Sequence, residues 1–84
     1  MGLRIRIHWF DEATDIEKGK EYSRDLGEDG SVMKVLGLPI EETVNNGLFD
    51  VTQAWLPTLQ PYFGHQIDLS TFIYQVGFSY REQW

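Results

Sequence analysis

The sequence predicts an α+β fold in a single small domain, in which an antiparallel β-sheet buries one face beneath a short α-helix. Two stretches, residues 71–81 and residues 3–10, alternate apolar side chains with polar or small ones. This period of two places the apolar side chains on one face of each strand, and that face needs a covering layer. Residues 31–36 have the apolar spacing of a short amphipathic helix, whose natural place is across the apolar face.

Length and composition restrict the class of protein. The 84 residues make one domain, residues 1–84, without an internal repeat or a linker. The absence of cysteine excludes disulfides and thiolate metal sites and predicts folding in the reducing cytoplasm. We find neither an apolar run long enough for a membrane span nor an export signal. The net charge of −6 opposes nucleic-acid binding and favours a basic partner.

The strand over residues 71–81 is expected to lie inside the sheet, because five large side chains share its apolar face. We expect its other face to be flat, mixed and open to water, and we interpret Gly77 there as a bulge or a close approach by another chain. The core-facing residues of the two strands are Leu3, Ile5, Ile7, Trp9, Phe72, Tyr74, Val76, Phe78 and Tyr80, and those on the open side are Arg4, Arg6, His8, Phe10, Ile73, Gln75, Gly77 and Ser79.

An acidic loop and a weaker strand are expected after the first strand. Residues 10–18 hold four carboxylates and make either a solvated turn or a docking edge. Residues 19–26 carry much charge, which suits an edge strand that pairs with the first strand as a hairpin. Residues 25–30 match a calcium loop at Asp25, Asp29 and Gly30, but Gly27 and Leu36 stand where ligands are required, so we interpret this segment as a turn.

The first helix has recognisable ends. Ser31 is expected to be its N-cap, and Gly37, followed by Pro39, is expected to end it. We expect Met33 on this helix to fill the core.

A tight turn and a second helix are expected next. Asn46 and Gly47 have the composition of a type I′ hairpin turn, which would leave Leu48 beside an exposed turn. Asp50 is expected to cap a helix over residues 51–59, although Pro57 and Pro61 limit its length. Residues 60–64 then form a turn with aromatic anchors.

Catalysis has little support in the sequence. His8 and His65 are the only histidines, and neither belongs to a metal-binding or catalytic pattern. The chain also lacks a P-loop and a nucleophile elbow. Besides a binding protein, two alternatives stay open on these grounds. One is a small acid–base enzyme that uses either histidine with a neighbouring carboxylate, and the other is an acidic homo-oligomeric module whose open sheet face pairs with itself.

The residues themselves carry a stronger signal, because a set of short matches spans Met1 to Trp84 and resembles the immunity proteins of cloacin and of the colicins that cleave ribosomal RNA. The matching segments are Met1-Gly2-Leu3, Trp9-Phe10-Asp11, Glu21-Tyr22-Ser23, Asp29-Gly30-Ser31-Val32-Met33, Asn45-Asn46-Gly47, Phe49-Asp50-Val51, Leu59-Gln60-Pro61-Tyr62-Phe63, His65-Gln66-Ile67-Asp68, Phe78, Tyr80-Arg81 and Trp84.

This resemblance implies a twisted four-stranded antiparallel sheet with a short helix packed on one face. It also implies a non-enzymatic function without a cofactor or metal, namely binding and inhibition of the C-terminal ribonuclease domain of a cognate toxin. The protein would act in the cytoplasm of the producing cell and leave it bound to the toxin. Contact with the toxin's translocation domain and a weak homodimer of the free protein are secondary expectations, and neither nucleic acid nor a membrane is an expected partner.

The resemblance also implies where the toxin binds. Phe10, Glu17, Leu48 and Gln75 match positions of the family's toxin-facing surface, and we expect Asp11 and Asp15 of the acidic loop to add charge to it. Family members carry aromatic residues at the positions of Glu17 and Gln75, and either a small thiol or a large aromatic residue at the position of Leu48. These departures imply a cognate toxin different from the best-known ones.

Overall fold

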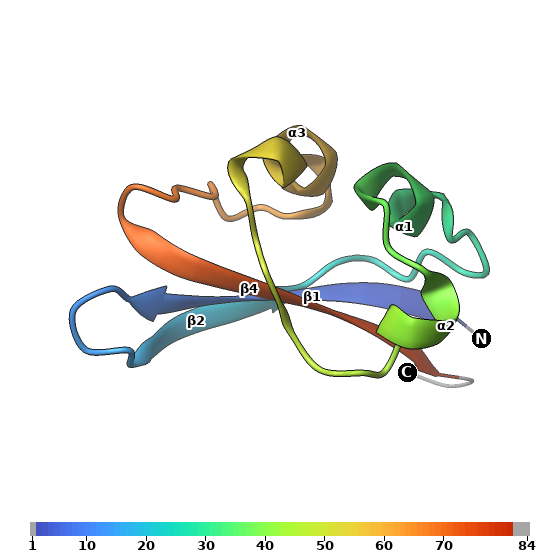
Figure 1. The fold of residues 1–84 in the computed structure, drawn as a ribbon, viewed down its shortest axis with the longest axis horizontal. Helices are drawn as coiled ribbons and strands as arrows, with labels where there is room; N and C mark the ends of the chain where they lie inside the picture. The colour runs from blue at the N-terminus through green and yellow to red at the C-terminus, as the bar shows by residue number, and fades with distance from the viewer. Residues whose placement is uncertain (1, 82–84) are drawn as a thin grey trace.

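A computed structural model of the chain describes residues 2–81 and shows a four-stranded antiparallel sheet with short helices (Figure 1). The strand order is β2-β1-β4-β3, so the two long strands lie at the centre. In chain order the elements are β1 (Gly2–Asp11), β2 (Glu17–Tyr22), α1 (Ser31–Leu36), α2 (Ile40–Thr43), β3 (Phe49–Asp50), the 3₁₀ turn η1 (Gln53–Trp55), α3 (Leu56–Leu59), the 3₁₀ turn η2 (Gln60–Tyr62) and β4 (Phe72–Arg81).

The central pair has the strand phase that the sequence predicted. β1 and β4 run antiparallel in one continuous register, from Gly2 opposite Arg81 to Asp11 opposite Phe72. Alternate side chains of both strands enter the core, and the most deeply buried are Ile5, Ile7, Tyr74, Val76 and Phe78. The α+β fold with two long inner strands is therefore confirmed.

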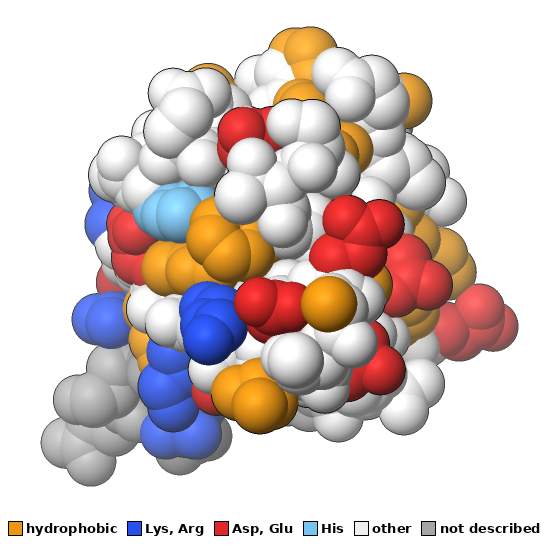
Figure 2. Space-filling view, turned by 90° about the vertical axis from the view of Figure 1, so that its left-hand side faces the viewer, with side chains coloured by type: hydrophobic (Ala, Val, Ile, Leu, Met, Phe, Trp, Pro, Cys, Tyr) orange, Lys and Arg blue, Asp and Glu red, His pale blue; other side chains and the backbone are white. Residues whose placement is uncertain are grey.

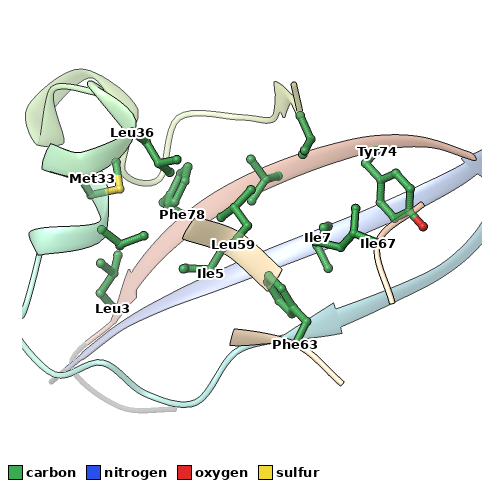
Figure 3. Close-up of a cluster of buried hydrophobic side chains, with 13 residues drawn as sticks. Leu3, Ile5, Ile7, Met33, Leu36, Leu59, Phe63, Ile67, Tyr74 and Phe78 are labelled. Atoms are coloured by element: carbon green, nitrogen blue, oxygen red, sulfur yellow. The ribbon is translucent and has the colours of Figure 1, made fainter. Parts of the chain in front are cut away.

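The core lies between the sheet and the helices. In Figure 1, α1 and α3 stand over the same side of the sheet. Met33 of α1 and Leu59 of α3 are fully buried, and they meet the apolar side chains of β1 and β4 from above (Figure 3). Met33 fills the core as predicted. The apolar faces of the strands thus pack against the apolar faces of the helices, and burial of both surfaces stabilises the domain.

The hairpin of β1 and β2 is confirmed, but its limits differ from the prediction. β2 begins at Glu17 instead of Gly19 and ends at Tyr22, and the pairing shifts between Trp9 and Phe10. The acidic loop is correspondingly shorter, because both of its ends join the strands. Beyond Tyr22 the chain keeps single main-chain hydrogen bonds to β1, with Ser23 donating to Ile5 at 2.8 Å. β2 is an edge strand, as its charge suggested.

The start of α1 differs from the prediction, and its end agrees. Gly30 is the N-cap, and Ser31, which was expected there, is the first helical residue. The Asp29 carboxylate accepts a hydrogen bond from the Ser31 main-chain N–H at 3.0 Å, so the side-chain acceptor comes from one residue before the cap. Gly37 ends the helix in the left-handed conformation, with φ of 77°.

The expected hairpin at Asn46 and Gly47 is wrong. A type I′ turn needs positive φ at both central residues, whereas Asn45 and Gly47 have it and Asn46 does not. The helix α2, which the sequence analysis missed, precedes this turn. Asn45 then pairs with β4 like a strand residue: its amide Nδ2 donates to the Tyr80 carbonyl at 3.2 Å, and its Oδ1 accepts from the Tyr80 N–H at 3.0 Å.

The second predicted helix is shorter and more irregular than expected. Asp50 belongs to β3 and does not cap a helix, and Thr52 takes the position before the first helical turn. The three short turns η1, α3 and η2 follow one another from residue 53 to residue 62, with Pro57 and Pro61 each near the start of a turn. Proline is tolerated in the first turn of a helix but not in its interior, which explains the subdivision.

Candidate partner-binding face

The sheet face opposite α1 and α3 carries the site residues that the sequence predicted on strands, and we call it the open face. Strand register decides which side chains share it, since directly opposed residues project to the same side. The open face contains Gly2, Arg4, Arg6, His8 and Phe10 of β1, Glu17, Lys20 and Tyr22 of β2, Asp50 of β3, and Ile73, Gln75, Gly77, Ser79 and Arg81 of β4.

Phe10 lies at the centre of one group of predicted residues. On β1 it stands opposite Glu17 of β2 and Ile73 of β4. Phe10, Ile73 and Gln75 line a shallow hollow of ≈ 230 Å³ together with Asp15. Asp15 reaches the hollow from the β1–β2 turn, where its φ is 59°. The hollow therefore combines apolar walls with an amide and a carboxylate, and it suits a partner side chain with an apolar stem and a basic end.

Leu48 reaches the same face from the other edge of the sheet. It precedes β3, it is 38% exposed, and its side chain lies against Gly77 of β4. Between Leu48 and the hollow, Gln75 donates a hydrogen bond from Nε2 to Oδ1 of Asp50 at 3.3 Å. Phe10, Glu17, Leu48 and Gln75 thus come from separate segments of the chain and lie on one surface.

Asp11 holds the β1–β2 turn. Its Oδ1 accepts hydrogen bonds from the main-chain N–H of Ala13 at 2.8 Å and of Thr14 at 3.2 Å. These two bonds, the Ala13 bond above all, hold the pKa of the Asp11 carboxyl below its usual range. Figure 2 views the molecule from the end where this turn lies and shows acidic side chains beside hydrophobic ones. Asp11 stands opposite Phe72, in the phase of the helix-covered side, so its charge lies in the turn and not on the open face.

Glu17 is positioned by a histidine. Its Oε1 pairs with Nδ1 of His8 on the neighbouring strand. The His8 ring in turn stacks on Phe10 with 6.4 Å between ring centroids. The Glu17 side chain keeps 43% of its surface exposed, so the pairing orients it without removing it from solvent. His8 therefore holds a predicted site residue in place on the open face.

His65 lies on the opposite, helix-covered side of the sheet. Its ring stacks on Trp9 with 3.8 Å between centroids, and its Nε2 lies 2.8 Å from the Tyr74 hydroxyl, whose pKa is raised by burial. The main-chain N–H groups of Gly64 and His65 donate to the Glu21 carboxylate at 2.7 Å and 3.0 Å. These contacts fix the loop before β4, and they place the two histidines in separate environments.

The centre of the open face is more covered than the sequence predicted. Gly77 and Ser79 are both buried, and the side chains of Arg6 and Leu48 lie over Gly77. The bulge considered for Gly77 is absent from the continuous register of β1 and β4, and the close approach comes from side chains of the same domain. Sequence reasoning missed Arg6 as a surface residue of interest. Its alternation phase was visible, but its contact with Gly77 depends on the strand register.

Other features of the described residues offer no reaction centre. Within residues 2–81, no three acidic or histidine side chains come together as a set that could hold a metal ion. In the same part of the chain, no helix is both long and apolar enough to cross a membrane. A second hollow, of ≈ 280 Å³, lies away from the predicted site residues and is lined mainly by apolar side chains, among them Leu3, Met33, Ile40 and Tyr80.

Comparison with known proteins decides the family. A family model described as cloacin immunity protein matches residues 2–81. The chain belongs to the cloacin immunity protein family. Members of this family are non-enzymatic inhibitors of the ribosomal RNase domain of cloacin-type colicins, so this member binds a cognate cloacin-type toxin. The resemblance seen in the sequence is confirmed, and the acid–base enzyme built on His8 or His65 is set aside.

For a cloacin immunity protein, the functional site is a surface that recognises another protein. Such a surface needs anchors that fit a partner and charges that orient it, and it needs no activated nucleophile or base. The open face supplies apolar groups at Phe10, Ile73 and Leu48, and the β1–β2 turn supplies carboxylates at its rim.

Proposed function

We propose that the open face and the β1–β2 turn bind the C-terminal ribonuclease domain of the cognate toxin. One observation carries this proposal: Phe10 and Glu17 of the β1–β2 hairpin share one face of the sheet with Leu48 and Gln75 from distant parts of the sequence, with Asp15 at its rim. Residues needed only for folding would not have to converge on the sheet face opposite the core.

The apolar and the charged residues of this surface have different roles. A few well-packed anchors carry most of the energy of a typical interface, and Phe10 and Leu48 are suited to this role. Charged groups chiefly accelerate encounter and fix orientation. Asp15 and Glu17 lie beside Phe10, and Asp11 adds negative charge in the adjoining turn, which complements a basic ribonuclease domain.

Inhibition then follows from occupancy and charge. The bound inhibitor covers part of the toxin surface that must approach the ribosome, and its net charge of −6 repels ribosomal RNA. The protein acts in the cytoplasm of the producing cell and leaves it bound to the toxin. A contact with the toxin's translocation domain and a weak homodimer of the free protein use the surface left outside the main interface.

Leu48→Trp tests the proposed surface. A tryptophan at this partly exposed position changes the volume of a side chain that a partner encloses, and we expect toxin binding to weaken by about 2 kcal/mol or more, the size of an interface hot spot. The melting temperature should barely change. Val35→Trp is the matched control, because Val35 is 69% exposed on α1, on the other side of the sheet. Calorimetric titration with the ribonuclease domain measures both, and equal affinity of the two variants would contradict the proposal.

Specificity can be tested on the same surface. Aromatic residues at positions 17 and 75, together with a cysteine at position 48, should shift protection toward the toxin of a relative that carries those residues. A cell-survival assay against both toxins measures the shift, and unchanged protection would place specificity elsewhere. Sedimentation of the free protein tests the homo-oligomeric alternative, since a monomer that forms a heterodimer only with toxin excludes self-association as its function.

A further inference from the structure

The cationic centre of the open face contrasts with the rest of this acidic protein. The chain has 13 acidic and seven basic residues, and four of the basic ones, Arg4, Arg6, Lys20 and Arg81, lie on the open face. Arg6 has the most central position of the four, on β1 between Tyr22 of β2 and Gly77 of β4. A partner surface that complements this arrangement is basic at its rim and acidic opposite the centre.

Gly77 determines how the Arg6 side chain lies. A Cβ atom added at Gly77 would stand 2.9 Å from Nη2 and 3.1 Å from Nε of Arg6, and 2.9 Å from Cδ2 of Leu48. The guanidinium group therefore lies close against β4 at an open-face position that has no side chain. The Leu48 side chain lies against the same glycine, so the Arg6 guanidinium group is next to a predicted anchor of the interface.

Arg6 has no charged partner in the described part of the chain. No carboxylate there forms an ion pair with it, and its Nε is buried without a hydrogen-bond partner. A half-buried guanidinium without an acceptor is unfavourable in the free protein, because its polar groups have lost part of their hydration. A planar guanidinium matches a carboxylate with two parallel hydrogen bonds, which lysine does not provide.

We propose that Arg6, seated on Gly77 and flanked by Leu48, is a specificity-determining residue that binds a carboxylate of the toxin's ribonuclease domain. This inference rests on the proposed binding of that domain by the open face. The acidic rim of the inhibitor attracts a basic domain. Arg6 supplies the cation of a central ion pair, and it favours a domain that presents an acidic side chain opposite this position.

Dissociation kinetics separate this role from general electrostatics. Arg6→Met removes the charge and keeps an apolar stem, which makes the inhibitor more negative and should leave association with a basic domain unchanged or slightly faster. Loss of a direct ion pair should instead raise the dissociation rate at least tenfold. Lys34→Met is the control, since it changes the charge equally on α1, and its dissociation rate should equal that of the wild type.

Two further variants keep the charge and change the geometry. Gly77→Ala needs the far ends of the Arg6 and Leu48 side chains to move, which flexible side chains can do, so we expect several-fold faster dissociation with a nearly unchanged melting temperature. Arg6→Lys should have an intermediate effect, because it keeps the charge and loses the paired geometry. These two variants also test the proposal if Arg6→Met fails to fold.

Double-mutant cycles identify the acceptor. Arg6→Met is combined with alanine at each Asp and Glu of the ribonuclease domain, and one pair should show strong coupling. Loss of affinity without coupling to any carboxylate would overturn the proposal, since the acceptor would then be a main-chain carbonyl. Dissociation of Arg6→Met as slow as that of Lys34→Met would overturn it as well. If Leu48→Trp still weakens binding in that case, the proposed function stands, and if Leu48→Trp has no effect, the open face itself is the wrong surface.

Discussion

Two glycines inside strands leave room for large side chains from neighbouring segments of the sheet. Gly19 of β2 lies under the indole of Trp9, which His65 covers on its other side at 3.8 Å. Gly77 of β4 lies under the ends of two flexible side chains on the open face. Neither glycine has a positive φ, so what an added side chain would disturb at each is the close approach of a neighbour and not the backbone conformation.

The neighbour of Gly19 is a stacked ring and the neighbours of Gly77 are flexible side chains, so we expect alanine to have unequal effects at the two positions. A Cβ at Gly19 would stand 2.4 Å from Cζ2 of Trp9, and the ring cannot retreat because His65 stacks behind it. We expect Gly19→Ala to cost about 1–3 kcal/mol, as overpacking does, which corresponds to about 4–8 °C in melting temperature per kcal/mol for a domain of this size. Gly77→Ala is the matched control and should melt near the wild type. Equal melting temperatures in thermal denaturation would contradict the rigidity of the Trp9 stack.

Asp68 gives the domain a pH-dependent contribution to stability. Its carboxylate accepts hydrogen bonds from the Ser70 hydroxyl at 2.6 Å and the Thr71 hydroxyl at 2.8 Å, and these bonds, with a third from the Ser70 N–H, hold the pKa of Asp68 below its usual range. Because the folded state binds the proton less readily than the unfolded chain, this contribution is complete above the unfolded pKa and is lost as the pH falls through the folded pKa.

Asp68→Asn should therefore destabilise the protein at neutral pH and have a smaller effect in acid. Thermal melts of both proteins between pH 7 and about pH 2.5 measure the difference in melting temperature. We expect this difference to shrink below about pH 4, where the Asp68 carboxylate of the unfolded wild-type chain begins to take up a proton while that of the folded protein stays charged. A difference that stays constant with pH would show that the hydrogen bonds to Ser70 and Thr71 do not depend on the charge of Asp68.

The elements with a strong local pattern could be predicted from the sequence. Alternation predicted β1 and β4 and their buried faces, and the glycine at position 37 predicted the end of α1. α2 and β3 could not be predicted, because both are very short and the turn between them depends on a contact far along the chain, the pairing of Asn45 with Tyr80. The turn composition at Asn46 and Gly47 indicated a hairpin that this long-range contact overrides.

The candidate site was predictable to the same extent. The resemblance singled out Phe10 and Gln75 as site residues, and alternation placed both on the open face, whereas Glu17 was placed in a loop because the start of β2 has no periodic signal. The contact of Arg6 and Leu48 with Gly77 could not be predicted, since it depends on the register of two strands and on the position of a third segment. Contacts across a sheet are set by tertiary pairing, which a single sequence does not specify.

The phase of β4 can be tested with two matched substitutions. Val76 is fully buried on the core side, and Ile73 is 40% exposed on the open face of the same strand. Val76→Asp places a charge in the core without a partner, and we expect it to prevent folding. Ile73→Asp makes a similar chemical change and should leave the domain folded. Circular dichroism melts compare the two, and equal loss of structure would mean that the faces are assigned wrongly.

At the scale of the whole molecule, the excess of negative charge should act on association. The net charge of −6 attracts a basic ribonuclease domain before contact, and salt screens this attraction within a Debye length of about 8 Å at physiological ionic strength. We expect the association rate to fall by about an order of magnitude between low and physiological salt, while the dissociation rate changes much less. Stopped-flow mixing measures both rates, and an association rate independent of salt would contradict electrostatic steering.

The central pairing of β1 with β4 also affects when this inhibitor becomes available. The two strands pair along their whole length although the other described elements lie between them in sequence. Closing so long a loop precedes the main gain in burial, and domains dominated by such non-local pairs fold in about milliseconds to seconds. During synthesis the β1–β2 hairpin can form early, but β1 keeps an unprotected edge until β4 has left the ribosome. A newly made toxin molecule therefore meets an inhibitor that can fold only after β4 has been synthesised.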